Sequence, residues 1–362
     1  MRSKTIYLIL LVGIWLMAGI PQPAVAAHGD EEEKVDVKSI IFDHIGDAYE
    51  WHLTTWGDRH ISIPLPVILY SDLSGWHLFS SSQLTHGGEH NGFHIAQGGP
   101  HDGKIVEKRA DGSEVRPIDL SLTKTAAGIL VNSLLLTGII LGVSRWYRRH
   151  TPSDNAPRGF VGAVEMLTVM VYEDIIKASI GKDYKRYAPY LLTAFYFIFI
   201  NNLMGLLPIF PGGANVTGNI AVTLVLALCT FLAVNLFATR EYWREIFWPD
   251  VPMWMKCPVP LMPVIEFFGI FTKPFALTVR LLANIMAGHS VILALVSLIF
   301  VTYSLGAAIH GSMTVISVLF CIFMNCLELL VAFIQAYVFT MLSAVFIGMS
   351  RVSHAGHDKT QE

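Results

Sequence analysis

The stretch Phe275-Ala-Leu-Thr-Val-Arg280-Leu-Leu-Ala-Asn284-Ile-Met-Ala-Gly-His289 places a single arginine inside a long apolar segment. An ionisable residue in such a segment is costly in hydrocarbon and is functional by default. Arginine does not in practice release its proton, so it cannot escape the cost of burial by becoming neutral. Arg280 therefore needs a carboxylate or a water-lined cavity. The alternative, a side chain that extends to the membrane interface, is disfavoured because 29 largely apolar residues follow it.

Arg280 lies in the first of two long apolar runs, at residues 274–309 and 312–349, with Gly311 between them. Each run of about 36 residues would measure roughly 54 Å as a helix, against a hydrocarbon core of about 30 Å. Tilts of up to about 40° leave apolar length to spare. The lengths therefore predict a strongly inclined or nearly in-plane helical hairpin. A shorter helix, broken at Gly288 or Gly306, is the alternative.

Helical periodicity of 100° per residue sorts the polar side chains of these runs. Asn284 lies one turn from Arg280 on nearly the same face, whereas His289, nine residues on, lies about 180° away. In the second run Glu328 and Gln335 are seven residues apart, which places them on a common stripe. The two runs thus carry the permanent cation Arg280 on one helix face, and the titratable residues His289 and Glu328 on other faces.

Glu266 precedes Arg280 by fourteen residues and is nearly in register with it. Titratable and amide groups on membrane helices are typical of a proton relay with an electrostatic gate, whereas packing alone rarely uses so many ionisable types. The candidate residues for proton translocation are Arg280, Asn284, His289, Glu328, Gln335 and Glu266.

Composition agrees with a membrane protein, because 53% of the 362 residues are hydrophobic and only 15% are charged. A net charge of -3 without a basic block excludes a nucleic-acid partner. The cysteines lack metal-ligand spacing and are interpreted as small core residues.

Three further spans are predicted near residues 126–143, 190–207 and 220–237, and 160–180 should form a helix in the inner interface. The predicted fold is an all-α integral membrane protein.

Basic loops predict the orientation of the chain. Lys and Arg side chains cluster at residues 145–158 and 177–186, whereas residues 208–218 contain none. The cationic loops and the C-terminus are therefore expected in the cytoplasm, and the segment before the first span outside.

The N-terminus has the order of a secretory signal, with Arg2 and Lys4, an apolar run and then Ala24-Val25-Ala26. Cleavage after Ala26 is predicted, and an uncleaved first helix is the alternative. Four parts follow: a signal peptide at 1–26, an exported segment with some β-structure at 27–121, a membrane domain at 122–351 and a cytoplasmic tail at 352–362.

Histidines recur at intervals of four in the exported segment, at His86, His90 and His94. A helix would bring them together at a metal, but Gly87, Gly88 and other glycines nearby disfavour a helix. A solvated loop is the expected structure there, and no metal site is predicted.

From residue 157 to 351 the chain resembles the a subunit of the F-type ATP synthase. The motifs that carry the resemblance are Asn202-Leu-Met-Gly-Leu-Leu-Pro208, Lys273-Pro274, Arg280-Leu-Leu-Ala-Asn284 and Gln335-Ala336. Arg280 falls at the position of the family's essential arginine, with Asn284 and Gln335 at those of its accompanying polar residues. His289 and Glu328 stand for the family's paired acid and histidine, in the arrangement that resembles mitochondrial members.

The resemblance implies two half-channels for protons beside a ring of c subunits, with b subunits of a peripheral stalk as further partners. Arg280 would separate the half-channels, His289 and Glu328 would line the outer one, and Glu266 is a weaker candidate for the cytoplasmic one. The implied location is a bacterial inner membrane, in contact with lipid. No catalytic group, cofactor or metal is expected in this chain, because ATP is made in the partner head of the synthase.

Two other functions also fit parts of the sequence. An ion-coupled secondary transporter would need intramembrane charges as well, but such proteins usually show internal repeats, and none is visible. A membrane-anchored metal sensor would depend on the exported histidines and would not need Arg280.

Overall fold

The computed structural model describes residues 46–56, 59–84, 88–96, 101–109, 113–150, 157–207, 212–248 and 261–351. The chain divides into two compact units. The N-terminal unit comprises Met1–Asn132 and Met204–Val216, and the helical unit comprises Ser133–Leu203 and Thr217–Glu362. The predicted signal peptide, His86 and the predicted cytoplasmic tail lie outside the described residues.

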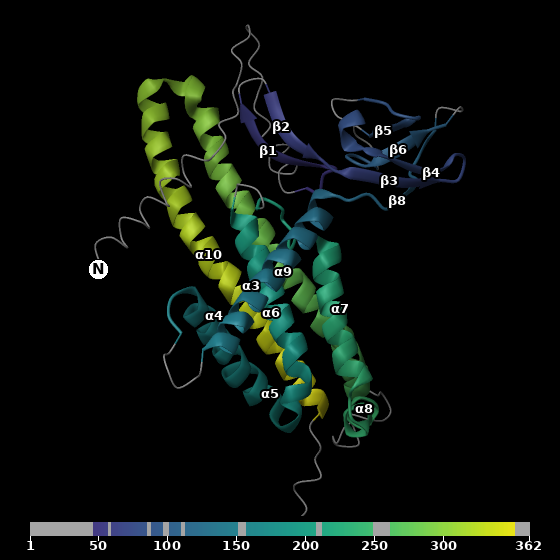
Figure 1. Cartoon of the computed structure of the whole chain (residues 1–362), viewed down its shortest axis with the longest axis vertical. Coiled ribbons are helices and arrows are strands. Elements are labelled where there is room, and N and C mark those ends of the chain that lie inside the picture. Colours follow the sequence, from purple (N-terminus) through teal and green to yellow (C-terminus); the bar gives the residue numbers. More distant parts are fainter. Residues whose placement is uncertain are drawn as a thin grey trace, which may run out of the picture. The chain divides into compact units, whose positions relative to one another are not determined.

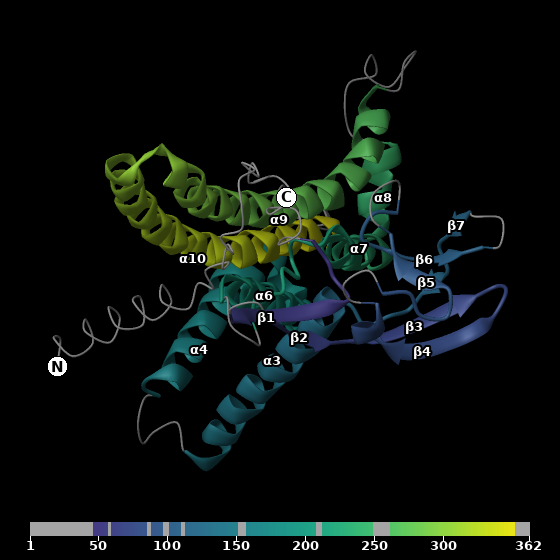
Figure 2. The same ribbon diagram turned by 90° about the horizontal axis from the view of Figure 1, so that it is seen from above.

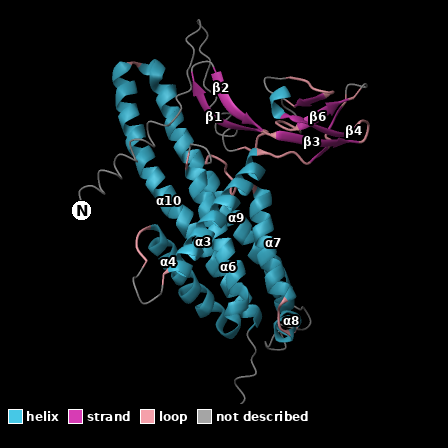
Figure 3. Cartoon of the chain, in the orientation of Figure 1, coloured by secondary structure: helices cyan, strands magenta, loops and turns pink. Residues whose placement is uncertain are grey.

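The N-terminal unit contains three small antiparallel sheets among its described residues (Figures 1 and 3). The first pairs β1 (Glu50–Trp56) with β2 (Arg59–Pro64), and the second has the order β4-β3-β8, with β3 at Pro66–Ser71, β4 at Gly75–Ser80 and β8 at Ile118–Asp119. The third joins β5 (Phe93–Ile95), β6 (Ile105–Lys108) and β7 (Glu114–Val115). A 3-10 turn, η1, covers Ser81–Gln83. The β-structure predicted for the exported segment is confirmed.

A small core holds the second and third sheets together. Val67 and Leu69 of β3 are fully buried and pack with Phe93 and Ile105 of the third sheet. At the edge of this core the Tyr49 hydroxyl donates a 2.5 Å hydrogen bond to Asp119 Oδ2. Burial, together with this carboxylate, raises the pKa of the Tyr49 phenol above its ordinary value.

The three predicted single spans are present as helices. They are α3 (Lys124–Arg149), α6 (Tyr184–Leu206) and α7 (Ile220–Leu236). After α7 the chain bends by 99° into the short helix α8 (Arg240–Phe247). Asn219 caps α7 by accepting a hydrogen bond from the Ala221 amide, and Thr239 caps α8 in the same way from Tyr242.

The segment predicted as an interfacial helix is helical throughout. It comprises α4 (Phe160–Val169), a π-helical stretch η3 (Met170–Lys177), α5 (Ala178–Ile180) and a 3-10 turn η4 (Gly181–Asp183). Its charged residues Glu173 and Lys177 form an exposed pair at 2.5 Å, while Val171, Ile175 and Ile176 are buried. The apolar positions pack inward and the charged ones do not.

The predicted hairpin consists of α9 (Leu261–Val301), the 3-10 turn η6 (Thr302–Leu305) and α10 (Ala307–Arg351). The two helices lie side by side in both views (Figures 1 and 2). With 41 and 45 residues they measure about 62 and 68 Å at about 1.5 Å per residue. Both are longer than the predicted runs, and each is long and apolar enough to be a candidate membrane span.

The position predicted for the hairpin turn was wrong. Gly311 lies inside α10, and the break falls at Gly306, whose φ of +98° is accessible to glycine and strained for other residues. Pro274 was expected to begin the first helix but lies inside α9. Gly288 does not break that helix either. The break at Gly306 is one of the two positions named in the alternative, but the helices on either side of it are long, so the shorter helix of that alternative is not found.

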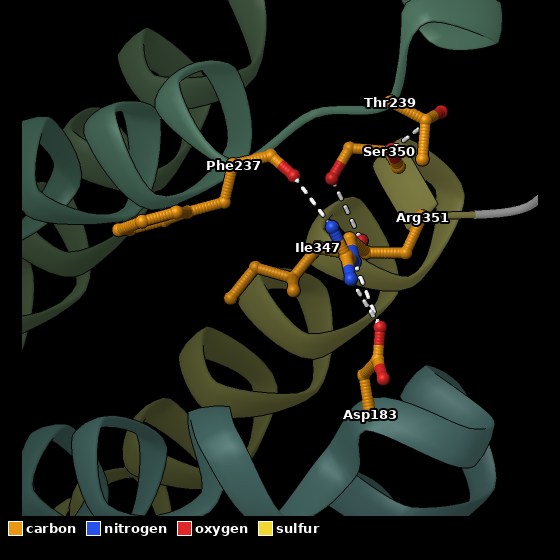
Figure 4. A network of polar contacts seen from close by, with 6 residues as sticks. All are labelled: Asp183, Phe237, Thr239, Ile347, Ser350 and Arg351. Atoms are coloured by element: carbon orange, nitrogen blue, oxygen red, sulfur yellow. Dashed lines mark hydrogen bonds and ion pairs between the residues drawn. The ribbon is translucent and has the colours of Figure 1, made fainter.

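Polar contacts fasten the end of α10 to the ends of neighbouring elements (Figure 4). Arg351 Nη1 donates to the Phe237 carbonyl at 3.0 Å, while its Nε donates to Asp183 Oδ2 at 3.0 Å. The Thr239 amide donates to the Ser350 carbonyl, also at 3.0 Å. The orphan carbonyls expected at a helix end are thus partly satisfied by other segments.

Candidate functional site

Arg280 lies on the exposed face of α9. The helix packs against α7 and α10, and its buried face is formed by Leu277, Leu281 and Ile285. Arg280 and Asn284 are both exposed on the other side, as their spacing of one turn predicts. Within the part of the chain that the structure describes, Arg280 has no ion pair and no hydrogen bond.

The surface around Arg280 is shaped by small side chains. Ala276, Ala283 and Ala287 are exposed one turn before, one turn after and two turns after the arginine, and Val279 is exposed beside it. Small residues on a membrane helix allow another helix to approach closely. Arg280 is therefore a permanent cation on an apolar surface of small side chains, which a second helix could approach closely.

His289 and Glu328 form the closest pair of titratable groups that the structure describes between α9 and α10. His289 Nδ1 lies 3.1 Å from Glu328 Oε1, and the two side chains are 19% and 4% exposed. His289 therefore faces the partner helix and not the surface that carries Arg280, as helix geometry predicted. An imidazole beside a buried carboxylate can exchange a proton over a short distance.

Gly288 makes room for this pair. A Cβ atom at this position would lie 2.9 Å from Glu328 Oε1 and 3.1 Å from its Cδ. The carboxylate thus packs directly against the backbone of α9. In the sequence Gly288 is only a possible helix break, because its contact with Glu328 depends on the packing of two segments 40 residues apart.

Gln335 is buried on α10, two turns after Glu328, as their common stripe predicts. Between them, the Ala332 carbonyl accepts a 3.2 Å hydrogen bond from Asn202 Nδ2 of α6. Asn202 Oδ1 in turn accepts a 2.6 Å hydrogen bond from Thr217 Oγ1. The role of Asn202 in joining α6 to α10 was not assigned from the sequence, where the signal was a buried amide within an apolar span.

Glu266 is separated from the other candidates. It is partly buried near the beginning of α9, fourteen residues or about 21 Å along the helix from Arg280. No ion pair is found for it among the described residues. The structure thus groups Arg280 with Asn284 and His289 with Glu328, but it leaves Glu266 outside both groups.

The histidines of the N-terminal unit form no metal cluster among the described residues. His94 lies on β5, and its Nε2 is 3.3 Å from Glu114 Oε1, while His90 lies just before that strand. The strand geometry removes the helical spacing that would have brought these rings together. The described cysteines, Cys229, Cys321 and Cys326, are free thiols.

A family model described as ATP synthase A chain matches residues 130–348, which include the whole of this site. The chain belongs to the ATP synthase A chain family. Its match extends over the α9–α10 hairpin, so the Arg280 surface and the His289–Glu328 pair both lie within the family region. A second model, described as a domain of unknown function, matches residues 40–121 in the N-terminal unit.

Curated relatives in the ATP synthase A chain family are similar over most of their length. ATP synthase subunit a of Chloroherpeton thalassium is 42% identical over 252 residues, which cover 67% of this chain and 70% of the relative. ATP synthase subunit a of Chlorobium phaeobacteroides is 40% identical over 248 residues, covering 66% and 68%. ATP synthase subunit a 2 of Chlorobaculum tepidum is 39% identical over 254 residues, covering 68% of each chain.

Proposed function

We propose that the chain forms two proton half-channels beside a rotating ring of c subunits, with Arg280 facing the ring. As a member of the ATP synthase A chain family, it is the proton-translocating subunit in the membrane sector of an F-type ATP synthase. It works together with the rest of that complex as a multi-pass membrane protein.

The observation that carries the proposal is the exposed Arg280 without a partner among the described residues. A guanidinium on an apolar membrane helix needs an anionic or aqueous partner. Since the described part of the chain supplies none, we propose that a carboxylate of another subunit is the partner. A ring carboxylate passing along the surface of Ala276, Ala283 and Ala287 would meet this requirement.

Arg280 would keep the two half-channels apart by electrostatics. An opposite charge nearby lowers the pKa of a carboxylate, so a ring carboxylate beside the guanidinium would be held ionised. The same cation would repel a proton moving directly from one half-channel to the other. A proton would then cross only on the ring, by rotation, and this requirement would couple proton flow to ATP synthesis.

His289 and Glu328 would form the proton-transfer station of the outer half-channel. Their 3.1 Å contact allows a proton to pass between imidazole and carboxylate. Asn284 and Gln335 would hold water or the ring carboxylate by hydrogen bonds through their amides. Glu266, at the far end of α9, would serve the cytoplasmic side.

The partners and orientation are proposed on the same basis. We place the chain in a bacterial inner membrane with its N-terminal unit in the periplasm and its C-terminus in the cytoplasm, because Lys and Arg cluster in the loops at 145–158 and 177–186. The c ring and the b subunits of a peripheral stalk would be its neighbours. Copurification of the chain with small hairpin subunits, b subunits and a soluble ATPase would test these assignments.

The decisive experiment is Arg280→Ala in complexes shown by native gel to be assembled. The variant should abolish coupled ATP synthesis and leave the membranes passively permeable to protons, because protonated ring carboxylates could pass without a full rotation. Val279→Ala, which truncates an exposed neighbour on the same helix, should retain both activities. Near-normal synthesis by an assembled Arg280→Ala complex would overturn the proposed role.

A further inference from the structure

The β4-β3-β8 sheet of the N-terminal unit has a second apolar face. Strand pairing places Tyr70 beside Trp76 and Ile118, and Ile68 beside Leu78. The Leu120 amide donates a 2.9 Å hydrogen bond to the Ile68 carbonyl, which extends the second row. Paired residues of antiparallel strands point to the same side. The sheet face comprises Ile68, Tyr70, Trp76, Leu78, Ile118 and Leu120.

This sheet face is strongly exposed. Trp76 is 66% exposed, Leu78 74%, Ile118 59% and Leu120 58%. The alternate residues Val67 and Leu69 of β3 point the other way, into the core with the third sheet. An antiparallel sheet with one solvated face normally alternates apolar and polar residues. A second face without a charged side chain, spread over three strands, is therefore expected to be covered in the working protein.

The sheet face is joined to a membrane helix by a short, fixed connection. Leu120 precedes the start of α3 at Lys124 by four residues, a distance of at most about 14 Å along an extended chain. The connection is held to the sheet region, because the Leu122 amide donates to the Pro66 carbonyl at 3.1 Å and the Lys124 amide to the Ala48 carbonyl at 2.8 Å. The Thr125 amide also donates to Asp47 Oδ1 at 3.0 Å.

The position of this connection decides what can cover the sheet face. In Figure 1 the strands β5 and β6 lie on one side of the β4-β3-β8 sheet, and the chain continues from β8 into the first turns of α3. Since the apolar part of α3 begins within one turn of Lys124, the predicted span begins only a few residues after Leu120. The face also has the composition of an interfacial belt, with Trp and Tyr rings among aliphatic side chains.

We infer that the sheet face of Ile68, Tyr70, Trp76, Leu78, Ile118 and Leu120 rests on the lipid bilayer at the boundary between headgroups and acyl chains. The N-terminal unit would then be a monotopic attachment beside the first span, with its β5-β6-β7 sheet directed to the aqueous side. Apolar area and aromatic rings would hold it there. This attachment would fix the start of α3 relative to the membrane surface.

The inference is tested with a photoreactive p-benzoylphenylalanine in place of Leu78, in the full chain assembled into the synthase in cell membranes. Lys108, exposed on β6, receives the same residue as a matched control. Because Leu78 is exposed, the substitution should leave assembly unchanged on a native gel. Illumination should yield phospholipid adducts, identified by mass spectrometry, at position 78 and not at position 108.

A second measurement uses Leu78→Cys and Lys108→Cys, each carrying a nitroxide in a background without the native cysteines. The complexes are reconstituted into vesicles of phosphatidylethanolamine and phosphatidylglycerol. The label at 78 should collide more often with oxygen and less often with an aqueous nickel chelate than the label at 108. Adducts to another protein subunit, or a label at 78 that is as accessible to nickel as the control, would overturn the inference.

Discussion

Gly288→Ala tests whether the close approach of Glu328 to α9 matters for proton transfer. The added methyl would lie 2.9 Å from Glu328 Oε1, 3.1 Å from Cδ and 3.4 Å from Cγ. Ordinary van der Waals contact requires the carboxylate to retreat by roughly 0.5 Å. If the carboxylate retreats directly away from His289, its contact with Nδ1, now 3.1 Å, would lengthen to about 3.6 Å, and the two groups would be less able to exchange a proton.

The effect on stability should be small, whereas the effect on proton transfer should be large. Alanine in a helix interior is favoured over glycine by about 1 kcal/mol, which offsets part of the roughly 1–3 kcal/mol cost of overpacking. A close polar contact to a charged group contributes about 1.5–3 kcal/mol when it is well aligned, as proton transfer requires. If that contact is lost from the proton path, the rate should fall about ten- to a hundredfold, at about 1.4 kcal/mol per factor of ten.

The assay is ATP-driven acidification of inverted membrane vesicles, normalised to the amount of assembled complex on a native gel. Gly269→Ala is the matched control, because it lies on the same helix and a Cβ there meets no atom within 4 Å. It should pump at the parental rate and assemble at least as well. Acidification by Gly288→Ala at the rate of this control would show that the packing of Glu328 against Gly288 is irrelevant to proton transfer.

Three further predictions follow from the same structure. Glu328→Gln should slow proton pumping without loss of assembly. The double exchange His289→Glu with Glu328→His should recover part of the rate, since the effects of substitutions at residues in contact are non-additive. If each single substitution leaves pumping at the parental rate, the two residues do not belong to the proton path. Asp183→Asn should weaken the contact with Arg351 at the end of α10. Because the pair is exposed, the temperature at which half of the complex has dissociated should fall by a few degrees at most. A large drop in this temperature would contradict the prediction. N-terminal sequencing of the mature chain should begin near Ala27, and retention of the first 26 residues would refute the cleavage prediction.

The architecture of the membrane domain was largely predictable because hydrocarbon imposes local rules. Every backbone polar group of a single span in the bilayer must be hydrogen-bonded within its own helix, so an apolar run such as 220–237 predicts a helix. Likewise the exposed face of Arg280 and Asn284 follows from a period that the chain carries within a few residues. The hairpin turn did not obey such a rule: Gly306 and Gly311 are both flexible, and only the packing of α9 against α10 decides which of them adopts a positive φ.

The sequence alone determined the protein class, the spans and which face of α9 bears the permanent charge, because hydropathy and helical period act over short distances along the chain. The tertiary structure alone decided that Glu328 packs against the backbone of α9 at Gly288, and that six apolar residues on or next to three strands share one exposed sheet face. Those relations join residues 39 or more positions apart in the first case and strands β3, β4 and β8 in the second. They depend on how α9 aligns with α10 and how β3 aligns with β4 and β8. Side-chain packing and hairpin closure set this alignment, and no periodic pattern in the sequence reveals it.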